Sequence, residues 1–243
     1  MITSLKRIAL FLRETFKALI YYPQYFSFKE AFANFLLWWK SLNQLRNSLV
    51  DASPWISFTV IKFLDEHLKP EMKVFEYGSG GSTLFFAKRA EKIVSIEHHK
   101  LWFEKVNLYL QELKLKNIDY KLFEPENDSE FYKKNIADPN DYISDDRESV
   151  GKNYEKYVKS IDAYPDEYFD VVSVDGRARP SCCKHTLPKI KKGGYLIYDN
   201  VETTYYENSI TLLKPNEWEV VRYYGLFPYL THFSMTLVAK KIN

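Results

Sequence analysis

Cysteine, net charge and long apolar runs are all scarce in this 243-residue sequence. The only cysteines are the neighbours Cys182 and Cys183, which excludes both a disulfide framework and the C-x-x-C spacing of zinc and redox sites. The 34 basic and 32 acidic residues leave a net charge of +2, so the chain lacks the basic field with which nucleic-acid-binding proteins attract their ligand. We therefore expect no nucleic-acid partner and a reducing compartment.

Charged residues interrupt every apolar stretch well before the ~20 residues that a membrane-spanning helix requires. The apolar run at residues 8–12 is too short for a signal peptide, and no small-residue cleavage site follows it. The sequence thus predicts a cytoplasmic protein. Its hydrophobic content of 46% is much higher than a disordered chain carries, so a folded globular core is expected.

Residues 1–50 form a cationic and apolar stretch, in which seven basic and two acidic residues give a local net charge of +5. The apolar spacing predicts two amphipathic helices, one that stops at Tyr22-Pro23 and one that opens with the capping box Ser27-x-x-Glu30 and can extend to residue 50. The apolar stripes are Leu5, Ile8, Leu12, Phe16 and Leu19, and then Phe28, Phe32, Phe35, Trp39 and Leu42. We interpret residues 1–52 as a helical extension. Three roles are open for it: a cap over the active site, a homodimer contact, or peripheral attachment to an anionic membrane.

From residue 53 onward strands alternate with helices, a rhythm that predicts a parallel sheet with right-handed crossovers. A first helix is expected to begin at Ser53-Pro54, and a polar insertion interrupts the rhythm near residues 125–167. The chain closes with two β-rich runs that no helix separates, as in an antiparallel hairpin. For residues 53–243 we therefore predict an α/β, Rossmann-like fold with a mostly parallel seven-stranded sheet, helices on both faces and a terminal hairpin. The expected strands lie at residues 73–77, 92–97, 118–123, 169–174, 195–198, 218–223 and 233–239.

The first turn between a strand and a helix carries the clearest chemical signal. Glu76 is followed by the turn Gly78-Ser79-Gly80-Gly81 and a helix, so that a cofactor can approach the backbone closely. Glu97 ends the next strand 19 residues after Gly78, near the spacing at which an acidic residue binds both hydroxyls of a ribose. Thr83 replaces the third glycine of G-x-G-x-x-G, which argues against a dinucleotide. The alternative is a tight turn that binds no ligand.

Residues 74–83 (VFEYGSGGST) and the later Ser95-Ile96-Glu97 resemble motif I and the acidic strand end of class I S-adenosylmethionine-dependent methyltransferases. The similarity continues in residues 168–177 and 192–200, which resemble the fourth and fifth strands of that family. In all, the resemblance covers residues 53–243.

The resemblance implies that S-adenosylmethionine is the cofactor. It also assigns parts of the cofactor to residues of this chain. Glu76 and the backbone of residues 78–81 would hold the methionine part, Glu97 the ribose, and Glu124, at the end of the third strand, the adenine.

Asp175 and the pair Asp199-Asn200 stand at the carboxyl ends of neighbouring predicted strands, where open α/β sheets bind their ligands. They resemble the metal triad of catechol and caffeoyl-CoA O-methyltransferases. That resemblance implies a divalent ion such as Mg²⁺ that binds the substrate hydroxyl, with Asp175 and Asp199 as catalytic residues and Asn200 as a further metal ligand. The lysine that commonly follows the first aspartate in that family is missing, and Arg177 and Arg179 follow instead. The alternative is a metal-free pocket lined by hydrogen-bonded aspartates.

Arg177 and Arg179 are predicted substrate-binding residues, because a guanidinium group can clamp a carboxylate or phosphate in bidentate fashion. Pairing with the acidic insertion is the alternative for both. Together these features predict methyl transfer to a small-molecule or glycan-like acceptor, at an oxygen atom. The competing hypothesis is a non-catalytic binding or assembly module of the same fold, recruited through its N-terminal helices.

Overall fold

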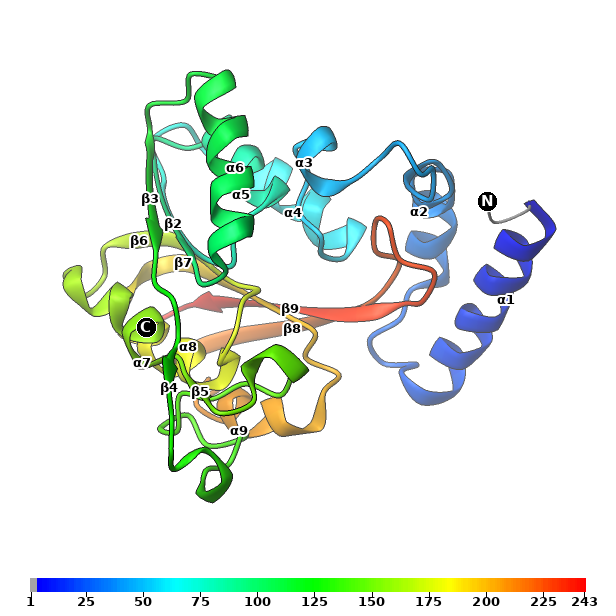
Figure 1. Ribbon diagram of the computed structural model, residues 1–243. Coiled ribbons are helices and arrows are strands. Elements are labelled where there is room, and N and C mark those ends of the chain that lie inside the picture. Colours follow the sequence, from blue (N-terminus) through cyan, green and yellow to red (C-terminus); the bar gives the residue numbers. More distant parts are fainter. Residues whose placement is uncertain (1–3) are drawn as a thin grey trace.

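The computed structural model describes residues 4–243 and contains a seven-stranded sheet in the order β3-β2-β1-β6-β7-β9-β8 (Figure 1). Neighbouring strands are parallel from β3 to β7, whereas β9 is antiparallel to both β7 and β8. The strands are β1 (Lys73–Tyr77), β2 (Lys92–Glu97), β3 (Ile118–Leu122), β6 (Phe169–Val174), β7 (Ile190–Asp199), β8 (Trp218–Gly225) and β9 (Ser234–Lys241). The predicted α/β, Rossmann-like fold with a terminal hairpin is confirmed, and residues 1–3 of the expected extension lie outside the described residues.

Helices cover both faces of this sheet, as expected. Successive side chains of a strand point to opposite faces, so Val74 joins a hydrophobic cluster with Phe86, while Phe75 joins a second cluster with Tyr157. The first cluster contains α4 and α5, and the second contains α7, α8 and α9. These helices, with α6, are α4 (Phe58–His67), α5 (Gly81–Ala87), α6 (Lys100–Glu112), α7 (Glu155–Lys159), α8 (Arg179–Thr186) and α9 (Glu207–Ile210).

The predicted insertion contains a small two-stranded ribbon of β4 (Glu126–Asn127) and β5 (Lys152–Asn153). Five short 3₁₀ helices are described, some in this insertion and some later in the chain. They are Phe131–Lys133, Arg147–Ser149, Ser160–Ala163, Leu187–Lys189 and Thr204–Tyr206. The insertion therefore has ordered secondary structure of its own, which positions it beside the functional site described below.

Two N-terminal helices, α1 (Ser4–Tyr21) and α2 (Phe28–Ser41), pack against the last two strands and the loop between them (Figure 1). Trp38 Nε1 donates a hydrogen bond to Leu230 O at 2.7 Å, and the buried Glu14 Oε2 accepts one from Phe233 N at 3.4 Å. Within residues 4–243, no helix combines the length and the hydrophobicity needed to cross a bilayer. A domain boundary at residue 52 stays a prediction, although the buried residues of α1 and α2 belong to the same hydrophobic cluster as the sheet.

The end of α2 differs from the prediction. The helix stops at Ser41 instead of extending to residue 50, because the Ser41 hydroxyl donates to Trp38 O at 2.8 Å and accepts a hydrogen bond from Tyr229 N at 3.1 Å. A separate short helix, α3 (Ser48–Asp51), follows and is capped by Asn47. The chain thus turns between α2 and α3, and α3 comes to lie against α5.

The start of α4 was also predicted too early. The helix begins at Phe58, because Phe58 N donates to Leu226 O at 3.0 Å and Ser57 N to Thr236 Oγ1 at 3.2 Å. These long-range bonds hold the first amides of the segment outside any earlier helical turn. Residues 53–56, expected as the first turn of this helix, instead form a non-helical connection beside the cavity described next.

Candidate functional site

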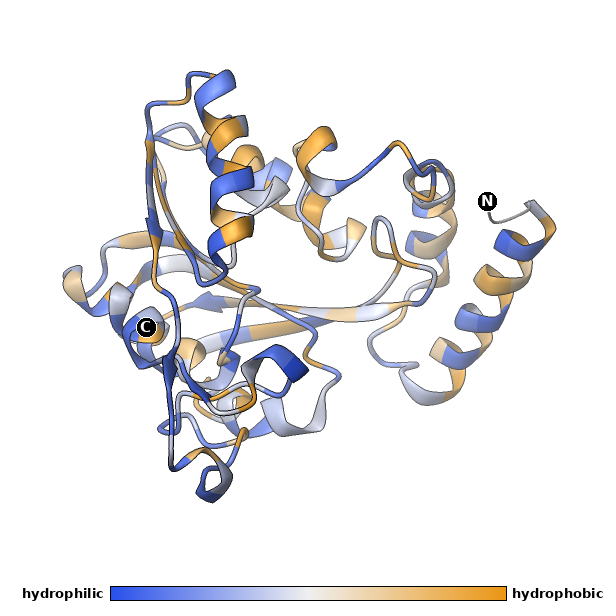
Figure 2. Cartoon of the chain, viewed as in Figure 1, coloured by the Kyte–Doolittle hydropathy of each residue, from blue (hydrophilic) through white to orange (hydrophobic). Residues whose placement is uncertain are grey.

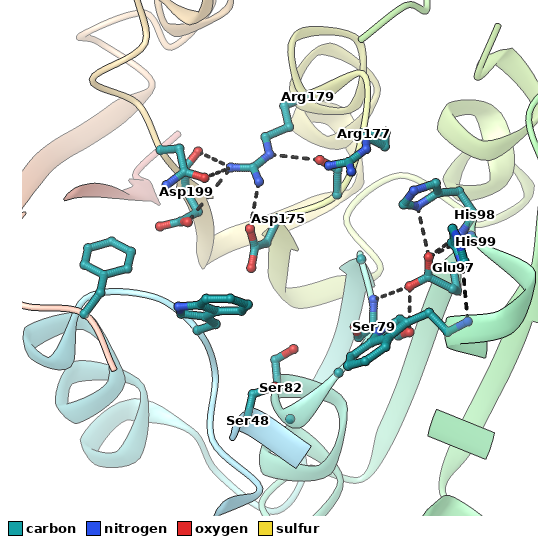
Figure 3. Close-up of a pocket in the computed structure, with 18 of the residues that line it drawn as sticks. Ser48, Ser79, Ser82, Glu97, His98, His99, Asp175, Arg177, Arg179 and Asp199 are labelled. Carbon is teal, nitrogen blue, oxygen red and sulfur yellow. Dashed lines mark hydrogen bonds and ion pairs between the residues drawn. The ribbon is translucent and has the colours of Figure 1, made fainter. Parts of the chain in front are cut away.

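The order of the parallel strands reverses at β1, with β2 and β3 on one side and β6 and β7 on the other. Open α/β sheets bind their ligands at the carboxyl edge beside such a reversal. A cavity of about 610 Å³ opens at this place (Figure 3). Its lining includes these predicted site residues: Gly78, Ser79, Gly80, Gly81, Glu97, Asp175, Arg177, Arg179, Asp199 and Asn200. The topology therefore brings together groups that follow four different strands.

The three glycines of the turn after β1 have different surroundings, so a side chain would have a different effect at each. Gly78 has φ +88°, and a Cβ there would lie 2.7 Å from a backbone oxygen of the loop after β6. A Cβ on Gly81 would lie 2.0 Å from Ser48 O, so this glycine lets α3 approach α5. A Cβ on Gly80 would meet nothing closer than Trp102, at 3.8 Å. Only Gly80 therefore borders open space in the cavity, as a glycine that lies against a ligand would.

Glu97 is a buried carboxylate that joins the loops after β1 and β2. Its Oε2 accepts hydrogen bonds from Ser79 N at 3.1 Å and from Ser79 Oγ at 2.8 Å, while Oε1 accepts from the N–H groups of His98 and His99 at 2.8 and 2.9 Å (Figure 3). Burial alone would raise the pKa of this carboxyl, but the hydrogen bonds and charge of His98, together with the other donors, outweigh it and lower the pKa to about 2. Glu97 is therefore ionised at neutral pH and borders the cavity.

Glu76 lies fully buried under the glycine turn, and its pKa is shifted in the opposite direction from that of Glu97. Its Oε2 accepts hydrogen bonds from Thr83 Oγ1 at 2.6 Å and Ser95 Oγ at 2.7 Å, but its Oε1 has no partner among the described residues. Burial raises the pKa of Glu76 to about 7, against the effect of the hydroxyl donors. A buried carboxyl with an unpaired oxygen is costly unless a ligand donates to it, and an ammonium group would do so.

Thr83 explains why the turn needs no third glycine. Its hydroxyl accepts a hydrogen bond from Gly80 N at 3.0 Å while it donates to Glu76. One side chain thus connects the turn to the buried carboxyl beneath it. From the sequence, Thr83 appeared only as a departure from the glycine pattern, and this role was missed.

Arg179 occupies the centre of the group that was predicted to bind a metal. Its guanidinium donates to Asp175 Oδ1 at 2.9 Å, to Asn200 Oδ1 at 2.8 Å, and to the backbone oxygens of Asp199 and Gly176 at 2.7 and 3.0 Å (Figure 3). The Asp199 side chain lies 3.9 Å from the same group and accepts a hydrogen bond from Thr236. The cation between the strand ends is therefore an arginine of the chain itself.

These residues do not fit a Mg²⁺ site. A divalent ion bound by Asp175, Asp199 and Asn200 would have to displace the guanidinium that already uses their oxygens. Among residues 4–243, no group of three histidine, cysteine, aspartate or glutamate side chains is placed to hold a metal. The same contacts bury Arg179, which still lines the cavity, and its role as a substrate-binding residue stays a prediction.

Arg177 and Glu124 lie outside the group of residues around Arg179 and Glu97. Arg177 is partly exposed at the rim and pairs with Asp146 of the insertion at 2.8 Å, as the alternative interpretation expected. Glu148, from the same insertion, lines the cavity. Glu124, which the resemblance assigns to adenine, is exposed and is not part of the cavity lining.

The opposite wall of the cavity comes from residues that lie outside the sequence motifs. It consists of Ser48, Trp55, Phe227, Leu230 and His232, with Trp102 from α6 beside the glycine turn. Trp102 Nε1 donates to Ser79 O at 2.8 Å, which fixes the indole against the turn. No local motif marks these positions, because they reach the cavity only through the packing of the N-terminal segment and the terminal hairpin.

A search against protein families finds no match for this sequence, and a search against curated protein sequences finds none either. Solved structures do match its fold. The O-methyltransferase TomG from Streptomyces achromogenes, in complex with SAM, aligns with a TM-score of 0.58 and 12% identity over 87% of this chain and 96% of that chain. The O-methyltransferase from Bacillus cereus, in complex with SAH, aligns with a TM-score of 0.56 and 11% identity over 98% of this chain and 100% of that chain.

An rRNA methylase from Streptococcus thermophilus also matches, with a TM-score of 0.52 and 16% identity over 75% of this chain and 93% of that chain. The three proteins have different names, and each aligns with this chain at a TM-score above 0.5. At these identities the likeness establishes the fold alone. The chain has the class I methyltransferase fold.

Proposed function

We propose that this cytoplasmic protein is an S-adenosylmethionine-dependent methyltransferase, which methylates an oxygen atom of a small-molecule or glycan-like acceptor. The observation that carries the proposal is the cavity at the strand reversal, which is lined by ionised Glu97 and the open side of Gly80 and lies above the buried Glu76 carboxyl with its unpaired oxygen. A volume of about 610 Å³ is in the range of small-molecule and cofactor sites. The near-neutral net charge favours a small acceptor over rRNA.

The residues of the cavity fit the parts of this cofactor. Glu97 would accept hydrogen bonds from the ribose hydroxyls, with the Ser79 hydroxyl turning away, and Glu76 would pair with the amino group of the methionine part. The backbone of the glycine turn would lie against the chain that links them. When bound, the cofactor supplies an electrophilic methyl group on a positively charged sulfur.

Asp199 is the candidate for removing the acceptor proton. Its Oδ1 accepts a hydrogen bond from Thr236 Oγ1 at 2.6 Å, whereas among the described residues its Oδ2 has no donor closer than the guanidinium at 3.9 Å. Burial and then the charge of Asp175 raise the pKa of Asp199 well above its usual value, against the effect of Arg179. A carboxylate of raised pKa is a stronger base for a hydroxyl proton. Asp175, tied to Arg179, would keep that guanidinium in place.

A thermal-shift experiment with the full-length protein tests the proposal. At a cofactor concentration of 100 times Kd, binding stabilises the folded state by about 2.7 kcal/mol, which for this chain length is a rise of about 5–10 °C in Tm. Gly80→Val is the matched control, since its side chain would enter the cavity without meeting protein atoms closer than 3.8 Å at Cβ. We expect a shift with S-adenosylmethionine and S-adenosylhomocysteine for the wild type only. No shift with either ligand would refute the proposal.

A panel of hydroxyl acceptors, with rRNA as the competing substrate class, then identifies the reaction. Rates are compared in EDTA and in Mg²⁺, and we expect them to be equal because Arg179 provides the cation between the strand ends. Loss of turnover in EDTA that Mg²⁺ restores would show that a metal displaces this arginine. Cofactor binding without methyl transfer to any acceptor would favour the non-catalytic hypothesis.

Binding of S-adenosylmethionine should release about one proton at pH 6, and the release should fall as the pH rises through 7. Glu76, with a pKa of about 7 in the free protein, is mostly protonated at the lower pH, and an ammonium group beside it stabilises the carboxylate. The affinity should accordingly increase as the pH rises from about 5 to 7. Calorimetry in two buffers of different ionisation enthalpy measures the proton count. Glu76→Gln should abolish the release, and an unchanged count in that variant would exclude Glu76 as its source.

A further inference from the structure

Helix α1 turns its apolar stripe away from the protein. The residues that it buries are Phe11, Glu14, Thr15 and Ala18. The stripe predicted from the sequence lies on another face of the helix and is exposed throughout, with Phe16 68% exposed. Figure 2 shows this helix at the edge of the molecule, with hydrophobic residues along its length. A contiguous apolar surface that no other part of the protein covers usually marks an interaction site.

Helix α2 also carries a row of exposed apolar residues. Phe28, Phe32 and Leu36 recur at every fourth position and are all exposed, Phe32 to 71%. The two helices are in contact, since the rings of Phe11 and Phe35 lie 4.7 Å apart. We call the exposed apolar stripe of α1 together with the exposed apolar row of α2 the docking face. It consists of Leu5, Ile8, Leu12, Phe16 and Leu19 of α1 and Phe28, Phe32 and Leu36 of α2.

Basic residues accompany the docking face. Lys6, Arg13 and Lys17 follow one another at intervals of seven and four, which places them on a common strip of α1 next to the apolar stripe. Lys29 and Lys40 are exposed on α2. The acidic residues of the two helices are only Glu14, whose buried carboxylate pairs with Arg13 at 2.7 Å, and Glu30. The surface therefore combines apolar side chains with a positive charge.

A basic cavity of about 440 Å³ lies where α1 begins and α2 ends. Its lining is Arg7, Trp39, Lys40, Asn43, Gln44 and Arg46, without an acidic side chain. Arg7 donates to the backbone oxygens of Trp39 and Leu42, and its buried Nε has no partner among the described residues. Arg46 additionally pairs with Asp51. Arg7 and Lys40, together with the amides of Asn43 and Gln44, are suited to a phosphate group.

We propose that α1 and α2 dock this protein on an anionic phospholipid bilayer. The docking face enters the headgroup region, the basic strip lies against the anionic surface, and the basic cavity receives a lipid phosphate. A second copy of the chain fits this face less well, because self-association would bring two sets of basic residues together. The proposal is independent of the chemistry in the large cavity.

Co-sedimentation of the full-length protein with vesicles tests the proposal. We expect binding to phosphatidylcholine vesicles that contain phosphatidylglycerol, loss of this binding at high salt, and little binding to phosphatidylcholine alone. Phe32→Asp should weaken binding by at least about tenfold. The matched control is Leu101→Asp, since Leu101 is also 71% exposed but lies on α6. Lys40→Glu, compared with Lys88→Glu on the C-cap of α5, tests the basic cavity in the same way.

Light scattering and circular dichroism distinguish the remaining outcomes. A variant that keeps its fold and loses only vesicle binding supports the bilayer. If Phe32→Asp proves unstable, Lys40→Glu and the salt dependence carry the test. A wild-type protein that ignores anionic vesicles at low salt overturns the proposal, and a dimer that Phe32→Asp dissociates would assign the docking face to a second copy.

Discussion

Glu97→Ala will weaken S-adenosylmethionine binding by about tenfold to a hundredfold, since hydrogen bonds to a charged group contribute about 1.5–3 kcal/mol. The substitution removes the ionised acceptor for the ribose. It also frees the N–H groups of Ser79, His98 and His99, which Glu97 holds in the unliganded protein. Isothermal titration calorimetry measures the loss directly. An unchanged Kd in a folded variant would remove Glu97 from the cofactor site.

Glu124→Ala is the informative control for this experiment. The family resemblance implies that Glu124 contacts the adenine of the cofactor. In the structure, however, Glu124 is exposed and is not part of the cavity lining. We expect its removal to change the Kd by less than about threefold, in keeping with a surface position. A loss as large as that of Glu97→Ala would mean that the loop after β3 moves onto the bound cofactor.

Arg179→Met will lower the free energy of unfolding by about 3–5 kcal/mol, the usual cost of removing one partner from a buried ion pair. The change leaves Asp175 and Asp199 without their shared cation and Asn200 Oδ1 without its donor. Urea unfolding monitored by circular dichroism measures the difference. Arg177→Met is the matched control, because its partly exposed pair with Asp146 should contribute about 1 kcal/mol or less.

The pH dependence separates this electrostatic loss from a simple packing defect. Burial already raises the pKa values of Asp175 and Asp199, and Arg179 opposes the rise. Without the arginine, the folded-state pKa values rise further above those of the unfolded chain, so stability is lost as the pH increases through them. The deficit of Arg179→Met should therefore be larger at pH 8 than at pH 5. A deficit independent of pH would contradict the assignment.

Local patterns explain how much of this fold could be predicted. Val74, Phe75 and Tyr77 indicate a short strand around Glu76, and the glycine turn and Glu97 follow at intervals set by a strand and a crossover helix. Such signals lie within about 25 residues of one another. The cofactor half of the candidate site was accessible from the sequence for this reason.

The acceptor half depended on geometry that no spacing reveals. Ala178 adopts a left-handed conformation, with φ 47°, and this directs the following Arg179 into the group formed by Asp175 and Asn200. The sequence shows two arginines after an aspartate but not which of them turns inward. Likewise, the helical period of α1 identifies an apolar stripe, while its burial is decided by distant contacts with the terminal hairpin.

The contacts with the terminal hairpin also determine when α1 and α2 can complete their packing during synthesis. Trp38 and its acceptor Leu230 are separated by 192 residues, so the N-terminal helices leave the ribosome long before their docking site exists. At roughly 5–20 residues per second, the delay is on the order of 10–40 s. Throughout that interval the faces of α1 and α2 that pack against the terminal hairpin are uncovered as well as the outer ones. The apolar N-terminal helices are therefore the first part of the nascent chain to be exposed and the last to be covered by their packing partners.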